Sequence, residues 1–167
     1  MEKWPDTLIA VVGKGRNCPP AVYDMAREVG ALVARQPGCL LVTGGLGGAM
    51  EAAARGAKEN GGRVLGLLPG SSNRTTRPHA EVDLRLDTGL TANGRNIVLA
   101  SVAHAMIAVP GSHGALQEMI VAVDAEKTVW ALGEHATRLP GVEYLASLEE
   151  LAARLTAFST APAPDRG

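Results

Sequence analysis

The stretch CLLVTGGLGGAMEAAARGAKEN, residues 39–60, contains the pattern that decides the fold. It begins with the apolar run 39–43, turns through the glycine-rich segment GGLGGAM, and continues as an alanine-rich segment up to about Asn60. A buried strand that passes through glycines directly into a helix is one half of a βαβ unit, and such units build parallel sheets. The stretch therefore predicts a parallel sheet with a tight turn at the carboxyl end of this strand.

The same alternation extends to both sides of this stretch. Apolar runs predict strands at residues 8–13, 63–68, 105–110 and 128–133, with a further short strand at 82–86. Helical spacing of apolar residues predicts helices after Pro20, from Thr91 to Ala103, after Gly114, and after a capping box formed by Ser147 and Glu150. We therefore expect a single α/β domain with a Rossmann-like, doubly wound parallel sheet in three layers. It would span residues 1–158 and be followed by a disordered tail at 159–167.

Composition narrows the class of protein. With 46% hydrophobic and 20% charged residues, the 167-residue chain has a globular balance and room for one core. A net charge of −1 and 3% aromatic residues disfavour a nucleic-acid partner. The two cysteines do not have the spacing of metal ligands. The start MEKWPDTLIAVVG lacks the features of a signal peptide. No apolar run reaches the roughly 18 residues of a membrane span. We expect a cytoplasmic protein with no membrane partner.

Three glycine-containing loops follow predicted strands, at residues 13–16, 43–50 and 110–114. In a parallel sheet these loops gather at the carboxyl edge, where ligands bind. Glycines let main-chain N–H groups approach an anion, and the helix N-terminus adds partial positive charge, so phosphate is the expected occupant. The alternative is that the glycines only allow a tight turn and close helix packing. Ordinary NAD binding is disfavoured, because the strand 63–68 ends without an acidic residue.

The loop 110–114 leads into a helix that carries Glu118. A carboxylate near a helix N-terminus usually stabilises the helix dipole by less than about 1 kcal/mol, so a chemical role requires a partner. Arg95 is the candidate partner, because it begins the helix that leads into the strand preceding this loop. Arg95 and Glu118 are therefore the candidate catalytic residues.

At these residues the sequence resembles the lonely-guy family and its relatives, the superfamily often mislabelled lysine decarboxylase. TGGLGGAM at 43–50 is similar to that family's GGGxxGxM turn, and PGSHGALQE at 110–118 is similar to its PGGxGTxxE signature. Arg95 precedes the second signature as the family's arginine does. The segment TANGRNIVLA, residues 91–100, also resembles the branch that includes molybdenum-cofactor carrier proteins. The departures from the second signature are Ser112, Ala115 and Gln117, which replace a glycine, a threonine and a glutamate.

The resemblance implies a phosphoribohydrolase, which cleaves a nucleoside 5′-monophosphate to free base and ribose 5-phosphate. Glu118 would stabilise positive charge on the ribose carbon or activate water. Arg95 would bind the phosphate or the base and keep Glu118 ionised. Further residues are expected to bind the phosphate or the ligand, many through main-chain amides: Gly13, Lys14, Gly44, Gly45, Gly47, Gly48, Met50, Asn96, Pro110, Gly111, Ser112, His113, Gly114 and Ala115.

A second interpretation is a non-catalytic carrier or sensor of a phosphorylated cofactor such as a pterin. It needs the same glycine loops but does not need Glu118 as a catalyst. The altered signature favours the carrier, whereas the retained pair Arg95 and Glu118 favours the hydrolase, which is the interpretation we prefer from the sequence. No cofactor is required and no metal site is expected; the ligand is a nucleotide or a phosphorylated pterin. Relatives of this kind are commonly oligomers, so we expect a homodimer or a larger homo-oligomer.

Overall fold

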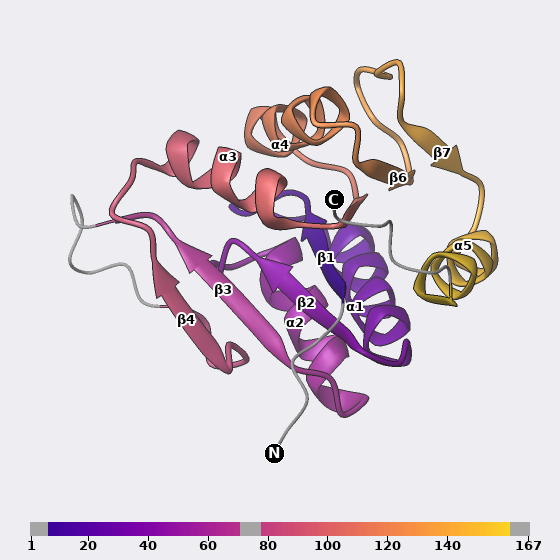
Figure 1. Ribbon diagram of the computed structural model, residues 1–167, viewed down its shortest axis with the longest axis horizontal. Helices are drawn as coiled ribbons and strands as arrows, with labels where there is room; N and C mark the ends of the chain where they lie inside the picture. The colour runs from indigo at the N-terminus through magenta and orange to yellow at the C-terminus, as the bar shows by residue number, and fades with distance from the viewer. Residues whose placement is uncertain (1–6, 71–77, 161–167) are drawn as a thin grey trace, which may run out of the picture.

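The computed structural model describes residues 7–70 and 78–160. In this part of the chain, seven parallel strands form one sheet in the order β4-β3-β2-β1-β5-β6-β7 (Figure 1). The strands are β1 (Thr7–Val12), β2 (Cys39–Thr43), β3 (Val64–Leu68), β4 (Leu84–Asp87), β5 (Ala105–Ala108), β6 (Thr128–Leu132) and β7 (Glu143–Leu145). The helices are α1 (Pro20–Ala34), α2 (Ala49–Glu59), α3 (Ala92–Val102), α4 (His113–Asp124) and α5 (Leu148–Thr160).

The strand order reverses at β1. From β1 the chain adds β2, β3 and β4 on one side, and then returns to place β5 against the other side of β1. In open α/β sheets such a reversal leaves a crevice outside the carboxyl ends of the strands. The loops that follow β1, β2 and β5 therefore lie next to one another at this edge, as the sequence predicted.

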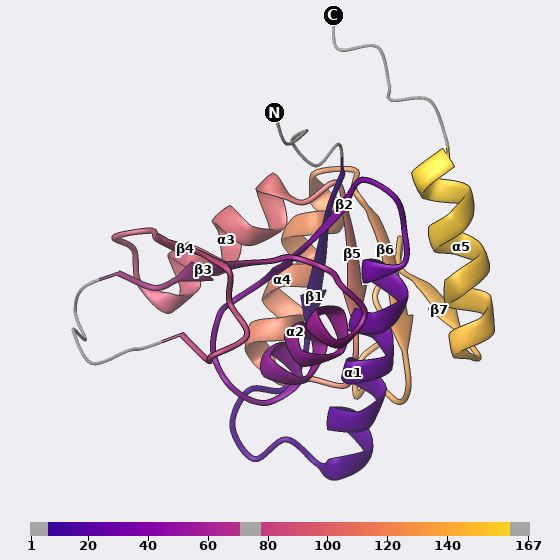
Figure 2. The ribbon, with the colours of Figure 1, turned by 90° about the horizontal axis from the view of Figure 1, so that it is seen from below.

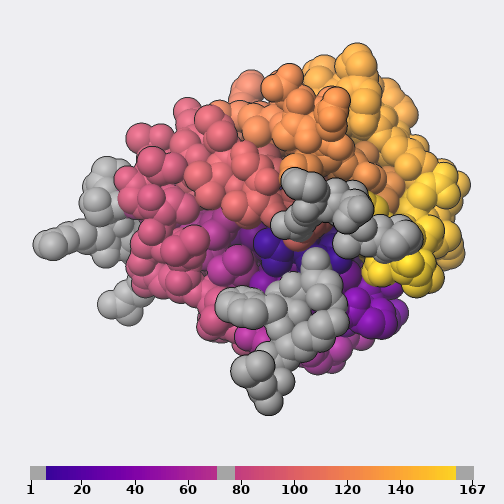
Figure 3. Space-filling model, in the orientation of Figure 1, coloured from indigo at the N-terminus to yellow at the C-terminus, as the bar shows by residue number. Residues whose placement is uncertain are grey.

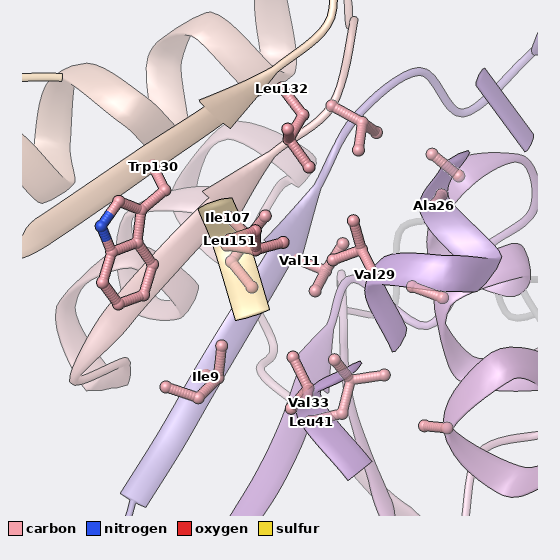
Figure 4. Packing of buried hydrophobic residues seen from close by; sticks show 14 of the residues in the cluster. Ile9, Val11, Ala26, Val29, Val33, Leu41, Ile107, Trp130, Leu132 and Leu151 are labelled. Atoms are coloured by element: carbon pink, nitrogen blue, oxygen red, sulfur yellow. The ribbon is translucent and has the colours of Figure 1, made fainter. Parts of the chain in front are cut away.

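Helices cover both faces of the sheet, which confirms the doubly wound, three-layer fold. One core cluster joins alternate strand residues such as Ile9 and Val11 to apolar residues of α1, α2 and α5 (Figure 4). The other cluster joins Ala10 and Val12 to residues of α3 and α4. The alternation within β1 follows from the pleat, because successive side chains of a strand point to opposite faces. Figure 2 shows α5 beside α1, at the opposite side of the sheet from α3.

The helices α1 and α2 pack with their backbones almost in contact. A Cβ atom on Gly30 of α1 would overlap the main chain of Ala53, and one on Gly56 of α2 would overlap the main chain of Arg27. Glycine at both positions therefore removes the side chains that would otherwise hold the two helices apart. This crossing fixes α2, and with it the turn that leads into α2, against the rest of the domain.

Most predicted elements occur where the sequence placed them. The short strand expected at 82–86 is β4, and Glu150 donates its amide to the Ser147 hydroxyl at 3.2 Å, as expected of a capping box. The strand β7 was not predicted. Helix α5 continues to Thr160, two residues into the segment 159–167 that composition assigned to a disordered tail. Residues 161–167 of that segment, and residues 71–77 of the loop after β3, lie outside the described residues.

Candidate functional site

The first glycine loop joins the other two through the main chain of Lys14. Its amide donates to the carbonyl of Pro110 at 3.2 Å, and its carbonyl accepts from the amide of Ala49 at 2.9 Å. The loops 43–50 and 110–114 therefore lie at the same edge of the sheet, on either side of Lys14. This confirms the geometry on which a shared anion site depends. Because both bonds use main-chain atoms, they leave the Lys14 ammonium group without a role in holding the loops together.

Glycine is required where these loops approach one another. Gly48 has a φ of 73°, and a Cβ atom there would overlap the carbonyl oxygens of Lys14 and Gly15. A Cβ atom on Gly13 would lie 2.8 Å from the Cβ of Ala49, and one on Gly111 would lie 2.5 Å from the Cβ of Ala115. Such distances are too short for side chains, so these glycines allow the loops to meet.

Two groups of main-chain amides remain available for a ligand. In the loop after β2, the N–H groups of Gly47 and Gly48 have no hydrogen-bond partner among the described residues. The same holds at the start of α4 for Ser112, His113 and Gly114. Unpaired donors at a helix N-terminus, together with the helix dipole, favour an anion. Gly45 differs, because its amide donates to the Thr43 hydroxyl at 3.0 Å.

Polar side chains complete this edge. Lys14 is half-buried and forms no ion pair within residues 7–70 and 78–160. Ser112 and His113 are exposed, and the Ser112 hydroxyl does not cap α4. The main-chain amide of His79 donates to the carbonyl of Gly45 at 3.1 Å, so the described end of the loop after β3 contacts the glycine-rich turn. The Ser112 hydroxyl and the main chain of Lys14 therefore belong to the same loops as the unpaired amides.

The remaining predicted ligand residues form the frame of the site. Met50 lies between the loops, where its Sδ would be 2.7 Å from a Cβ on Gly44 and its Cε 3.4 Å from one on Gly15. Ala115, which replaces the family's threonine, is buried in the core shared by the sheet and α3 and α4. Pro110 contributes its carbonyl to the bond with Lys14. These side chains position the loops, and no hydroxyl is present at position 115 to bind phosphate.

Arg95 is buried and braces the main chain. Its Nη1 donates to the carbonyls of Gly44 at 2.5 Å and Leu67 at 2.7 Å, and its Nε donates to Oδ1 of Asn96 at 3.0 Å. The guanidinium therefore connects α3 to the ends of β2 and β3. Burial lowers the pKa of Arg95, and the nearby Glu118 opposes that effect. The amide group of Asn96 is also engaged, because its Nδ2 donates to Oε1 of Gln117 at 3.1 Å.

Glu118 lies on α4 with 7% of its surface exposed and has no hydrogen-bond partner among the described residues. Burial raises its pKa to about 7, although the charge of Arg95 acts in the opposite direction. Arg95 favours the ionised form of Glu118, as expected, but its charge does not keep Glu118 ionised, because burial outweighs it. Desolvation disfavours the carboxylate more strongly than one guanidinium, already shared between two carbonyls, stabilises it. Near neutral pH the carboxyl group exists in both protonation states.

This raised pKa predicts an unusual pH dependence of stability. The folded protein holds the Glu118 proton up to about pH 7, whereas the unfolded chain releases it near pH 4.5. Stability is therefore lost as pH rises between these values, by about 3 kcal/mol in total. We expect the variant Glu118→Gln to match the wild type below pH 4.5 and to exceed its free energy of unfolding by up to about 3 kcal/mol at pH 8. Urea unfolding across this range measures the difference, and a difference that does not vary with pH would contradict the burial effect.

A cavity of about 210 Å³ opens beside the start of α4, and sequence reasoning did not find it. Its walls come from Gly111–His113, from the α4 side chains of Leu116 and Met119, and from residues 135–137 of the loop after β6. His135 in this loop is half-buried and lines the cavity. The loop carries no motif, so its sequence gave no signal that it lies against α4.

Within the described residues, no group of histidine, cysteine, aspartate and glutamate side chains has the arrangement of a metal site. In the same part of the chain, no helix is long and apolar enough to cross a membrane. The site therefore consists of main-chain donors, a few polar side chains and one buried pair of charged residues.

Known proteins are similar to this chain in sequence or in structure. An uncharacterised protein of Archaeoglobus fulgidus is 36% identical over 124 residues, which are 74% of this chain and 78% of that protein. The molybdenum cofactor binding protein of Rippkaea orientalis has a TM-score of 0.80 and 28% identity, over 96% of this chain and all of that one. The molybdenum cofactor carrier protein of Chlamydomonas reinhardtii has a TM-score of 0.78 and 30% identity, over 93% of this chain and 99% of that one.

The model of the SLOG cluster4 family matches residues 6–156. That range includes both glycine-rich signatures, Arg95 and Glu118. It confirms the resemblance drawn from these motifs, because the match covers nearly the whole domain. The chain belongs to the SLOG cluster4 family.

Proposed function

We propose that this protein binds and carries a small phosphorylated cofactor, with the molybdenum cofactor as its cargo, and that it does not transform this ligand chemically. The observation that carries the proposal is the state of the two candidate catalytic groups. Arg95 is committed to the carbonyls of Gly44 and Leu67, and Glu118 is buried with its pKa raised to about 7. The amides of Gly47, Gly48, Ser112, His113 and Gly114, in contrast, have no hydrogen-bond partner among the described residues.

The hydrogen-bond donors of the glycine loops suit a phosphorylated cofactor. The molybdenum cofactor is a phosphorylated pterin, and its phosphate would accept hydrogen bonds from the amides of Gly47, Gly48, Ser112, His113 and Gly114. The ammonium of Lys14 and the dipole of α4 would add positive charge there. The similar proteins of Rippkaea orientalis and Chlamydomonas reinhardtii, described as a binding protein and a carrier of this cofactor, support the choice of cargo.

A second candidate is the phosphoribohydrolase, and one observation favours it. Glu118 is close enough to Arg95 to feel its charge and has a pKa of about 7, which is close to the operating pH that general acid–base catalysis requires. In this role the carboxyl group would activate water or stabilise the positive charge that develops on the ribose carbon. The carrier remains the better-supported function, because the same carboxyl group is nearly enclosed by protein.

Two measurements on the purified protein separate these functions. We expect the wild type to retain molybdenum and pterin in equal amounts after gel filtration with released molybdenum cofactor, and to release no base from a panel of nucleoside monophosphates. Glu118→Gln serves as the control, and it should retain the cofactor as the wild type does. Base release that disappears in Glu118→Gln would establish the hydrolase instead. Absence of both cofactor retention and base release would reject both functions.

We also propose that the protein acts as a homo-oligomer through the outer surface of α3 and α4. Figure 3 shows these two segments next to each other at the molecular surface, where Ile97, Val102 and Ile120 are exposed. Exposed large apolar side chains favour contact with a second copy. Light scattering is expected to give at least the mass of a dimer, and a monomer mass at micromolar concentration would reject the proposal.

A further inference from the structure

The cavity beside α4 is continuous with the amides that would hold the phosphate. Gly111, Ser112 and His113 line it, and the same segment supplies the unpaired N–H groups at the start of α4. A ligand whose phosphate lies on these amides can therefore extend into the cavity without crossing protein. Its volume of about 210 Å³ is below the roughly 300–1,000 Å³ of sites for drug-sized ligands, so it suits one ring system.

The lining of the cavity combines an apolar floor with a polar rim. Leu116 and the buried Met119 form the floor, and Ser112, His135 and Thr137 supply polar groups around it. Ligand sites are generally lined in this way, with apolar side chains for the body of the ligand and a few polar groups for orientation. A methionine thioether also makes favourable contacts with aromatic rings. This chemistry suits a flat heteroaromatic ring with polar atoms on its edges.

The outer wall of the cavity is built before any ligand arrives. Tyr144 of β7 accepts a hydrogen bond from the amide of Leu139 at 2.7 Å, and Arg138 lies over its ring at 4.0 Å. The ring of His135 packs edge-on against Tyr144, with centroids 5.8 Å apart, and its Nε2 lies 3.0 Å from the carbonyl of Leu132. These contacts hold the loop after β6 in place. Figure 1 shows this loop passing from β6 to β7 beside α4.

The cavity and the buried charged pair lie on different flanks of α4. Arg95 and Glu118 are not among the residues that line the cavity, and Gln117 bonds Asn96 of α3, whereas Leu116 and Met119 line the cavity together with the loop after β6. A ring in the cavity would therefore lie on the flank of α4 that faces away from Asn96 and α3. Occupation of this cavity is compatible with binding and transport, and it does not place the ligand against Glu118.

We propose that this cavity is the subsite for the heteroaromatic ring of the same ligand whose phosphate binds the glycine loops. The proposal rests on the proposed function, because it assumes that the α4 amides hold the phosphate. For the molybdenum cofactor the occupant is the pterin. The loop after β6 then sets which ring systems bind, while the glycine loops recognise only the phosphate.

Filling the cavity tests the proposal. Ala136 is exposed at its rim, so Ala136→Leu should fold normally and reduce the space available to a ring. We expect roughly a tenfold or greater rise in the dissociation constant for the molybdenum cofactor, and no change in the stabilisation given by inorganic phosphate in thermal unfolding. The matched control is Ala153→Leu, at an exposed position of α5 on the opposite face of the sheet, which should bind both probes as the wild type does.

The outcomes separate this inference from the proposed function. If Ala136→Leu binds the cofactor as tightly as the wild type, the ring lies elsewhere and the inference is wrong, although the carrier function remains. If the variant also loses the response to inorganic phosphate, the effect is not confined to the ring, and the inference is wrong. If the wild type binds neither probe, the proposed function fails and the ring subsite fails with it.

Discussion

Replacement of Arg95 by methionine is expected to lower the free energy of unfolding by about 3–5 kcal/mol at pH 8. Methionine keeps most of the apolar length of the side chain but removes the guanidinium. The carbonyls of Gly44 and Leu67 then lose a buried donor, and Glu118 loses a positive charge that stabilises its carboxylate. Removing one partner of a buried charged pair is costly, because the other charge remains desolvated.

Urea unfolding measures this loss, and two further variants identify its cause. Arg27→Met removes an arginine whose ion pair with Glu59, at 2.7 Å, is screened by solvent, so it should have little effect on the free energy of unfolding. The double variant Arg95→Met, Glu118→Gln should recover about 1 kcal/mol or more relative to Arg95→Met alone. A loss in Arg95→Met as small as that in Arg27→Met would show that Arg95 does not brace the site.

The second large effect is expected for Gly48→Ala. The new methyl group would overlap the carbonyl oxygens of Lys14 and Gly15, and the φ of 73° is strained for any residue with a side chain. Strain and overlap together should cost about 3 kcal/mol or more. Relief of the overlap requires movement of Lys14, so we also expect cofactor retention to be lost.

Gly47→Ala is the matched control, because it makes the same change one residue earlier in the same turn. At Gly47 the φ is not positive, and an added Cβ would meet only Oε2 of Glu51, at 3.7 Å. Its free energy of unfolding should stay within about 1 kcal/mol of the wild type. Equal destabilisation of the two variants would mean that the turn does not depend on the close approach of Gly48 to the first loop.

Local sequence was sufficient for most of the fold, because the strands near the centre of the sheet are buried on both faces. Such strands, including β1 and β2, appear as uninterrupted apolar runs that end at glycine-rich turns. The strand β7 is different. It is three residues long, its first residue is exposed, and it exists because it pairs with the edge of β6. A segment stabilised mainly by tertiary pairing carries little local signal.

The location of the site could be predicted from the sequence. Which of its donors and side chains are free to bind a ligand could not. The convergence of the loops follows from parallel strand order, which the sequence implied. The engagement of the Gly45 amide by Thr43, and of the Arg95 guanidinium by two carbonyls, depends on tertiary distances. The protonation of Glu118 was mispredicted for the same reason. The sequence indicated that Arg95 lies near Glu118. The pKa of Glu118, however, depends on how deeply its carboxyl group is buried, and only the folded structure shows that burial.

The contact between α1 and α2 at Gly30 and Gly56 has a consequence for how proteins of this architecture diversify. Because the turn into α2 is anchored by a helix pair in close main-chain contact, a larger residue at Gly30 or Gly56 would force the two helices apart and disturb the fold. The connection between β6 and β7 carries no such restriction, since most of its residues are exposed. New ligand preferences should therefore arise mainly through changes in the length and composition of that connection.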